Sequence, residues 1–87
     1  MTEAQLEKKA CRYAVKRGWL TFKFVSTSQR GVPDRLFFRD EKLIIIEFKA
    51  PGKKATKLQC AIHDKFAKHG FHVFIVDNYE QAKRILE

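Results

Sequence analysis

GVPDRLFFRDEKLIIIEFKAP, residues 31–51, contains the most apolar segment of the chain and several of its charged residues. Its hydrophobic run, residues 43–46, leads directly into Glu47, Phe48 and Lys49. Because side chains alternate along a strand, Glu47 and Lys49 share one face, about 7 Å apart at the backbone, and Phe48 points the opposite way into a core. An acid and a base at the end of a core strand indicate a functional site at the rim of a covered sheet.

A hairpin is expected to bring a second acid to the same place. The pair Asp40-Glu41 is predicted to be the turn between antiparallel strands over 34–38 and 42–50. Asp34 begins the first strand and Glu47 lies near the end of the second, so counting back from the turn places them close together. The pattern therefore predicts that two carboxylates and a lysine converge.

Helix and strand signals continue outward from this hairpin. The predicted elements, in chain order, are a helix capped by Thr2 and closed by Gly18, strands over 19–26, 34–38 and 42–50, a helix from Thr56 to about His69, a strand over 71–77, and a short helix with a capping box of Asn78 and Gln81. The most apolar strand, 42–50, is expected to lie centrally. The passage from the third strand to the fourth is expected to be a right-handed parallel crossover. The predicted class is α/β, with the order α-β-β-β-α-β-α and a small mixed sheet flanked by helices, in one domain over residues 1–87.

The chain is strongly basic. It carries 18 lysines and arginines against 10 aspartates and glutamates, which gives a net charge of +8. This charge indicates a polyanionic partner, nucleic acid first and an anionic membrane second, with general solubility as the alternative. No run approaches the ~20 apolar residues of a membrane-spanning helix. No amino-terminal signal is recognised, and no strongly amphipathic basic helix favours a membrane surface.

Several side chains are expected to be structural. Cys11 and Cys60 form no C-x-x-C motif and suit a reducing cytosol as small core residues. Trp19 and the phenylalanines are predicted to be core residues rather than platforms for bases. The second helix is expected to leave His63 and His69 exposed. Its predicted inward residues are Leu58, Ala61, Ile62 and Phe66.

The predicted acid pair favours a cation, because repulsion between two carboxylates otherwise raises the pKa of one of them. Carboxylate oxygens suit Mg²⁺ or Mn²⁺, which take further ligands from water and phosphate. Such an ion polarises a phosphoryl oxygen and generates hydroxide. Lys49 would then orient the attacking water or stabilise negative charge on the phosphorane. The alternative for Glu47 and Lys49 alone is a rim salt bridge, against which Asp34, Pro33 and the net charge argue.

The motifs G-V-P-D at 31–34, I-I-I-E-F-K at 44–49 and L-Q at 58–59 together resemble the PD-(D/E)XK nuclease signature. The closer resemblance is to the virus-type replication-repair nuclease group, VRR-NUC. It runs from the first helix through residues 47–59 to residues 70–77, nearly the whole chain. The resemblance implies a restriction-endonuclease-like core and metal-dependent cleavage of DNA.

The resemblance also implies individual roles. Asp34 and Glu47 match metal ligands, with the Phe48 carbonyl as a further candidate, and Lys49 matches the catalytic lysine. Two more residues match the group's pattern: Glu7 as an acid on the first helix, and Gln59 as a glutamine that orients a ligand or a phosphate. For Glu7 the alternative is an exposed helix neighbour of Cys11, and for Gln59 it is a helix-surface residue.

Basic residues surround the expected site. Backbone N–H groups at the amino end of the second helix favour phosphate there. The predicted DNA-binding residues are Arg30, Arg35, Lys53, Lys54 and Lys57. A second basic surface is expected from Lys8, Lys9, Arg12, Lys16 and Arg17. Phosphate contacts of this kind give affinity without sequence information.

The function expected from these features is a Mg²⁺- or Mn²⁺-dependent DNA endonuclease. Stand-alone members of the group resemble structure-specific nucleases, with four-way (Holliday) junctions as the expected substrate. Two symmetric cuts require two sites, so a two-fold homodimer is expected. The alternatives are a nicking or flap-type nuclease and a non-catalytic basic DNA-binding module. The resemblance suggests a bacterial or phage origin and action in the host cytoplasm.

Overall fold

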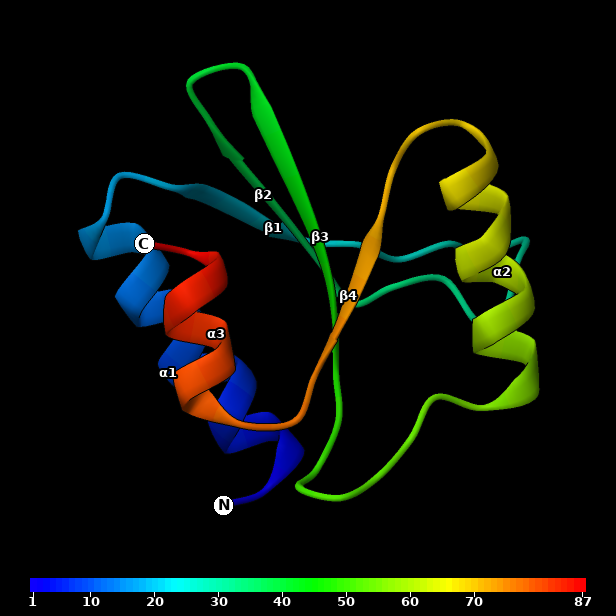
Figure 1. Cartoon of the computed structure of the whole chain (residues 1–87), viewed down its shortest axis with the longest axis horizontal. Helices are drawn as coiled ribbons and strands as arrows, with labels where there is room; N and C mark the ends of the chain where they lie inside the picture. The colour runs from blue at the N-terminus through cyan, green and yellow to red at the C-terminus, as the bar shows by residue number, and fades with distance from the viewer.

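The computed structural model describes all residues from Met1 to Glu87. Its elements are α1 (Glu3–Lys16), β1 (Leu20–Lys23), β2 (Arg35–Arg39), β3 (Lys42–Phe48), α2 (Lys57–Lys68), β4 (Val73–Val76) and α3 (Tyr79–Ile85). The four strands form one sheet in the order β1-β2-β3-β4, in which the first two pairs are antiparallel and β3 pairs with β4 in parallel (Figure 1). The predicted element order, mixed sheet, parallel crossover and internal position of β3 are confirmed.

The β2–β3 hairpin has the register that the sequence predicts. Its turn residues, Asp40 and Glu41, have φ angles of 50° and 66°, as a tight two-residue hairpin turn requires. The last ladder pair is Arg35 opposite Ile46. Asp34 continues the pairing, because its N–H donates to the Ile46 carbonyl at 3.1 Å.

Side-chain caps fix where the helices begin. Thr2 and Thr56 form complete capping boxes with Gln5 and Gln59, which satisfy amide groups at the amino ends of α1 and α2. The third predicted box is only half formed. Asn78 accepts from the Gln81 N–H at 2.8 Å, but the Gln81 side-chain amide donates to the Ile75 carbonyl at 3.1 Å.

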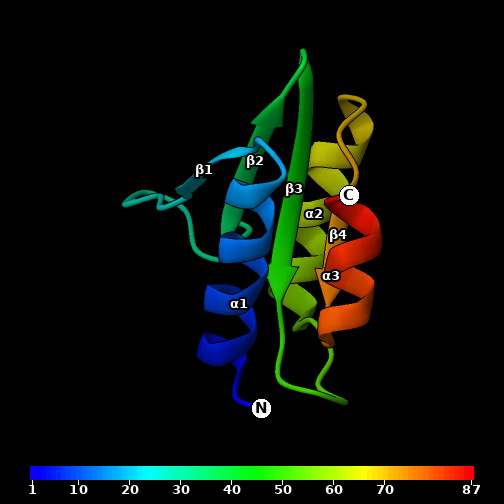
Figure 2. The same cartoon turned by 90° about the vertical axis from the view of Figure 1, so that its left-hand side faces the viewer.

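Helices cover both faces of the sheet. Helices α1 and α3 lie together on one face and α2 lies on the other (Figure 2). The main core lies under α1 and α3, and the Trp19 indole N–H donates to the Leu86 carbonyl at 2.9 Å within it. Its buried residues are Leu6, Ala10, Ala14, Trp19, Phe37, Ile46, Phe48, Val76, Ala82 and Leu86. None of the three helices is long and apolar enough to cross a membrane.

A glycine lets α2 approach the loop before Asp34. Gly31 has a φ of 86°, and a Cβ atom built there would lie 3.0 Å from the Leu58 side chain and 3.2 Å from Ile62. A larger residue would both strain the backbone and push α2 outward. The first residue of the G-V-P-D motif therefore sets how closely α2 packs beside the candidate site.

The inward face of α2 differs from the predicted one. Leu58 and Ala61 are exposed, and His63, predicted to be exposed, is buried with 8% of its surface accessible. The physical reason is the buried acid Glu47 on the sheet below, which draws polar residues of α2 inward. The prediction that Cys60 is a core residue is wrong for the same reason, because it lies on the exposed side.

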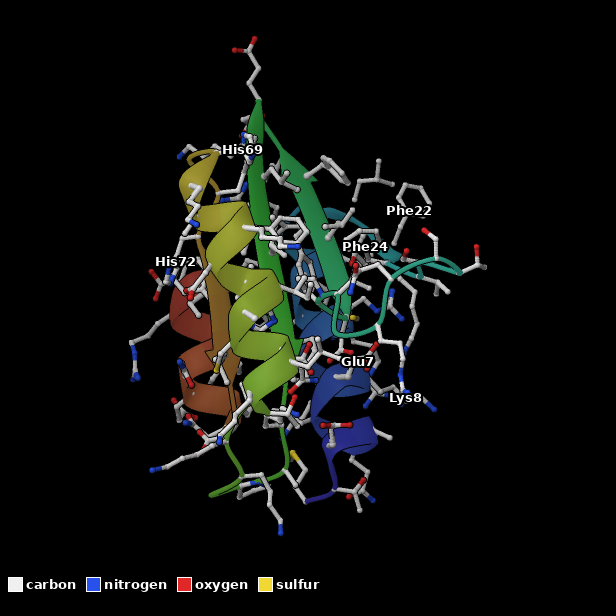
Figure 3. All side chains as sticks on the ribbon, turned by 90° about the vertical axis from the view of Figure 1, so that its right-hand side faces the viewer. Glu7, Lys8, Phe22, Phe24, His69 and His72 are labelled. Carbon is white, nitrogen blue, oxygen red and sulfur yellow. The ribbon has the colours of Figure 1, made fainter.

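The expectation that all phenylalanines are core residues is also wrong. Phe22 is 57% exposed, and Phe38 and Phe71 are exposed as well. Phe22 lies beyond the area that α2 covers (Figure 3). The strands are also shorter than predicted at several ends: β1 ends at Lys23, although the Phe24 N–H still donates to the Asp34 carbonyl at 2.8 Å, and β4 spans only Val73–Val76.

Candidate active site

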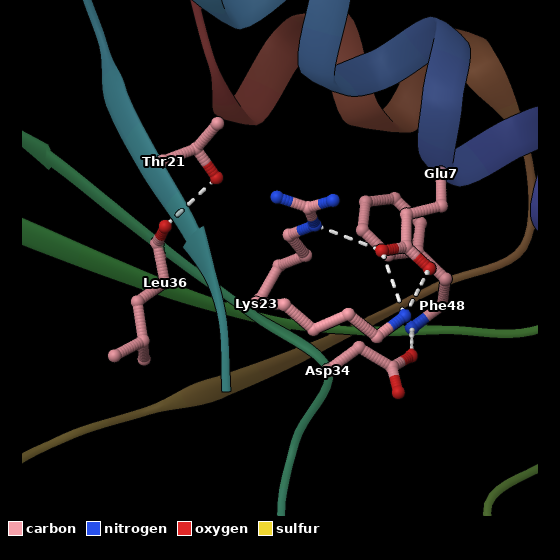
Figure 4. A network of polar contacts seen from close by, with 7 residues as sticks. Glu7, Thr21, Lys23, Asp34, Leu36 and Phe48 are labelled. Carbon is pink, nitrogen blue, oxygen red and sulfur yellow. Dashed lines mark hydrogen bonds and ion pairs between the residues drawn. The ribbon is translucent and has the colours of Figure 1, made fainter. Parts of the chain in front are cut away.

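The hairpin brings Asp34 and Glu47 together. The Phe48 N–H, next to Glu47, donates to Asp34 Oδ2 at 2.8 Å (Figure 4). Glu47 points to the α2 face and is only 3% exposed. The two acids are close enough that each changes the pKa of the other. The predicted convergence of two carboxylates is therefore present in the structure.

Lys49 completes the predicted cluster. Its Nζ lies 3.8 Å from Glu47 Oε2, and its side chain is largely buried. Its backbone N–H donates to the Val76 carbonyl at 2.9 Å, which ties the residues after β3 to β4. The lysine is thus held beside the acid pair, at the carboxyl end of β3.

Helix α2 presents two polar residues to Glu47, one to each carboxylate oxygen. Gln59 Nε2 donates to Oε2 at 3.0 Å, while Gln59 Oε1 accepts from the Thr56 N–H at 2.9 Å. His63 Nε2 lies 3.9 Å from Oε1. Gln59 therefore contacts the site directly and is not a free helix-surface residue. Sequence reasoning missed His63, although its spacing of four from Gln59 places both on one helix face.

Glu7 reaches the edge of the cluster from α1. It accepts from Arg35 Nε at 2.8 Å and pairs with Lys23 Nζ at 3.3 Å (Figure 4). Its side chain is largely buried, so the alternative of an exposed helix neighbour is wrong. Its direct partners are two cations, and its charge still helps to raise the pKa of Asp34.

Comparisons with known proteins agree with this arrangement. No family model matches the chain. A solved structure described as a VRR_NUC domain superposes with a TM-score of 0.87 and 26% identity, covering 98% of this chain and 95% of that one. "Putative nuclease p44" of Acyrthosiphon pisum secondary endosymbiont phage 1 is 38% identical over 79 residues, which span 90% of this chain and 85% of the relative. The chain belongs to the VRR-NUC nuclease family.

The predicted family and the PD-(D/E)XK-like core are therefore confirmed, and so is nuclease activity at the level of the family. In this VRR-NUC chain, the antiparallel pairing of β2 with β3 brings Asp34, just before β2, to the carboxyl end of β3, where Glu47 lies. The roles of its individual residues stay predictions, for which the electrostatics of the site provide the physical basis.

Burial and mutual repulsion make this acid pair costly to ionise. Burial first, and the Asp34 carboxylate second, raise the pKa of Glu47 to about 7, against the lowering effect of Lys49. Burial also raises the pKa of Asp34, while the Phe48 N–H lowers it. The pKa of His63 is lowered by burial and then by the nearby Lys49 charge. A cation between the carboxylates would remove this cost.

The donor set of this VRR-NUC chain fits a hard divalent ion. Glu47 Oε1 is buried and has no hydrogen-bond partner, and the Asp34 carboxylate is close enough to raise the pKa of Glu47. No group of three or more His, Cys, Asp or Glu side chains is close enough to hold a metal by itself. Mg²⁺ and Mn²⁺ accept one or two carboxylates together with water and phosphate oxygens, whereas structural zinc sites need four protein ligands.

The residues predicted to bind DNA differ in their surroundings. Lys53, Lys54 and Lys57 are exposed between β3 and the first turn of α2, and none forms an ion pair. Arg30 is exposed in the loop before β2. Arg35 is instead partly buried and donates through Nε to Glu7 at 2.8 Å.

Proposed function

We propose that this chain is a Mg²⁺- or Mn²⁺-dependent, structure-specific DNA endonuclease, formed by one nuclease domain over residues 1–87. The observation that carries the proposal is the buried Glu47 Oε1, which has no hydrogen-bond partner. Lys49 Nζ lies 3.8 Å from the other oxygen, Oε2, and the Asp34 carboxylate is close enough to raise the pKa of Glu47. An unpaired buried carboxylate oxygen is costly. A divalent ion bound by Asp34, Glu47 and the Phe48 carbonyl would offset that cost.

Each polar residue has a distinct task in this proposal. The bound ion would polarise a phosphoryl oxygen and lower the pKa of a water molecule. Lys49 stabilises negative charge on the phosphate or orients the attacking water. Gln59 holds Glu47 through Oε2. Glu7 orients Arg35 and Lys23 at the edge of the site.

The proposed substrate is a four-way DNA junction cut by a homodimer. A junction is cut symmetrically by two equivalent centres, and one chain offers a single acid cluster, so a two-fold dimer is the natural assembly. The exposed lysines 53, 54 and 57 beside the cluster suit recognition of DNA shape through phosphates rather than bases. Action would take place in a bacterial or phage-infected host cytoplasm.

Two alternatives predict different outcomes. A nicking or flap-type nuclease would cut a flap or a linear duplex as well as a junction. A non-catalytic DNA-binding module would bind without cutting, and the buried cluster of Asp34, Glu47 and Lys49 argues against it, because a binding surface has no need of costly buried charge.

The experiment is incubation of the chain with a synthetic junction, a flap and a linear duplex, each with Mg²⁺, Mn²⁺ or a chelator. The proposal expects paired symmetric cuts in the junction only, dependent on the metal. Equal cutting of the duplex would favour the alternative nuclease, and no cutting with retained binding would favour the binding module. Sedimentation of the free and junction-bound protein tests the dimer.

A further inference from the structure

We infer that a groove along the outer side of α1 holds the sugar-phosphate backbone of one DNA strand leading to the acid cluster. This inference rests on the proposed function, because it names the route by which the same DNA reaches the site. The groove lies between α1 and β1 and has a volume of about 610 Å³. Its walls contain five basic side chains, Lys8, Arg12, Lys16, Lys23 and Arg35, against one acid, Glu7.

The helix arranges three of these cations in a row. Lys8, Arg12 and Lys16 are spaced by four residues, so they lie on one face of α1. At about 1.5 Å of rise per residue the row is about 12 Å long, which corresponds to roughly three or four phosphates of one strand at about 3.4 Å each. All three side chains are exposed.

Two other cations of this region, Lys9 and Arg17, contact tyrosine rings instead of the groove. Lys9 Nζ lies 4.3 Å from the centre of the Tyr79 ring, and Arg17 lies 5.0 Å from that of Tyr13. Both therefore pack against tyrosines and do not line the groove. Of the five cations predicted to form a second basic surface, only Lys8, Arg12 and Lys16 line the groove.

Two residues of the groove wall, Glu7 and Lys23, also act on Asp34 of the acid cluster. Glu7 belongs to the groove wall, and its neighbour Lys8 lies at the same end of α1 (Figure 3). Lys23 pairs with Glu7 and also lowers the pKa of Asp34 through its charge. A strand that follows Lys16, Arg12 and Lys8 thus arrives beside Asp34. The other lining residues, Ala4, Cys11 and Val15, have no charge to repel phosphate.

The test compares two double variants in an Asp34→Asn background, which should block cleavage and allow binding to be measured. Lys8→Gln with Arg12→Gln removes two groove cations. Lys65→Gln with Lys68→Gln removes two exposed cations from the far end of α2 and is the matched control. Fluorescence anisotropy with a labelled junction is recorded at several salt concentrations.

The inference expects the groove variant to bind about tenfold more weakly per cation removed near 0.1 M salt, with the slope of log K against log salt reduced by about two. The control should bind like its parent. Equal weakening in both variants, or no change in the groove variant, would overturn the inference. Because binding is measured without cleavage, the proposed nuclease function can fail separately, by absence of metal-dependent cutting in the unmodified chain.

We further infer that His63 is a positioning residue for Glu47, on a separate observation. His63 is 8% exposed, and neither ring nitrogen has a hydrogen-bond partner; Glu47 Oε1, 3.9 Å from Nε2, has none either. Two buried unpaired polar groups that face each other are rare in folded proteins. Gln59 already holds Oε2, so His63 is the group on α2 that can fix the remaining oxygen, closing on it when DNA and the ion are bound.

The test uses His63→Leu, which removes the ring nitrogens at similar volume, and His63→Gln, which keeps a side-chain N–H. Calorimetric Mn²⁺ binding and thermal unfolding are measured together with junction cleavage. His63→Leu should fold at least as stably as the unmodified chain but lose Mn²⁺ affinity and activity by about 10–100-fold, and His63→Gln should restore most of both. Unchanged Mn²⁺ affinity in His63→Leu, or equal loss in the two variants, would contradict this role.

Discussion

Gln59 joins a helix cap to the acid cluster through one side chain. Its Oε1 accepts from the Thr56 N–H at 2.9 Å, and its Nε2 donates to Glu47 Oε2 at 3.0 Å. The residue that completes the capping box of α2 therefore also orients the buried acid of β3. A change at this position is expected to alter both the stability of the helix and the chemistry of the site.

Gln59→Leu should separate these two effects when it is compared with Gln5→Leu. Both glutamines complete a capping box, so each substitution should lower the free energy of unfolding by roughly 0.5–1 kcal/mol. Only Gln59 touches Glu47, so cleavage should fall about 10–100-fold in Gln59→Leu alone. Urea unfolding and single-turnover cleavage measure the two quantities. Similar activity losses in both variants would mean that the cap alone is responsible.

Asp34→Asn should abolish cleavage while the protein becomes more stable. Burial raises the pKa of Asp34, so its ionised form is disfavoured in the metal-free protein, whereas asparagine keeps an oxygen to accept the Phe48 N–H. Cleavage should fall by roughly a hundredfold or more, with DNA binding retained or tighter because a negative charge is lost. A melting temperature in chelator that is lower for Asp34→Asn than for the unmodified chain would contradict the proposed cost of burying two repelling carboxylates.

The register of the β2–β3 hairpin could be predicted from the sequence. A two-residue turn at Asp40-Glu41 fixes the register of both strands, and register alone places Asp34 beside Glu47. The rotation of α2 was not predictable in the same way. Hydrophobic periodicity favours Leu58 and Ala61 as inward residues, but the buried Glu47 needs polar partners, and that requirement appears only once α2 lies over β3.

The exposed phenylalanines have a related explanation. Phe22 lies on β1, at the edge of the sheet that α2 does not cover. Alternation of residues in the sequence shows which side chains share a face, but not how far a helix extends across that face. The ion pair between Glu7 and Arg35 could not be predicted from the sequence either, because the two residues are distant in the chain and meet only when α1 packs on the sheet.

The stability of the metal-free protein should fall as pH rises toward neutral. Burial and Asp34 raise the pKa of Glu47 from 4.5 to about 7, so the folded chain binds more protons than the unfolded chain between these values. The stabilisation that comes from Glu47 is fully present below pH 4.5 and is lost as pH rises through about 7. His63 contributes the opposite slope, because burial lowers its pKa.

The comparison with Glu47→Gln isolates the Glu47 contribution from that of His63. Urea unfolding in chelator at several pH values between about 4.5 and 8 should show the decrease in the unmodified chain and a smaller one in the variant. Identical pH profiles for the two proteins would show that Glu47 titrates normally. With Mn²⁺ present the trend should reverse, because the ion binds only the deprotonated acids.

Lys49→Gln should lose cleavage without losing the fold. The lysine lowers the pKa of Glu47, so its removal should also move the pH dependence of Mn²⁺ binding to higher pH. Cleavage at saturating Mn²⁺ should fall by roughly 10²–10³-fold, while junction binding changes little. Retained cleavage at saturating metal would assign Lys49 to the salt bridge with Glu47 and not to the reaction.

Calorimetric titration of Mn²⁺ into the metal-free chain, into Asp34→Asn and into Glu47→Gln shows whether the two acids share one divalent ion. If both acids hold one divalent ion, the unmodified chain will bind Mn²⁺ with release of protons near pH 7, and each variant will lose most of that affinity. Equal Mn²⁺ binding by all three proteins, or none by the unmodified chain in the presence of junction DNA, would contradict the claim.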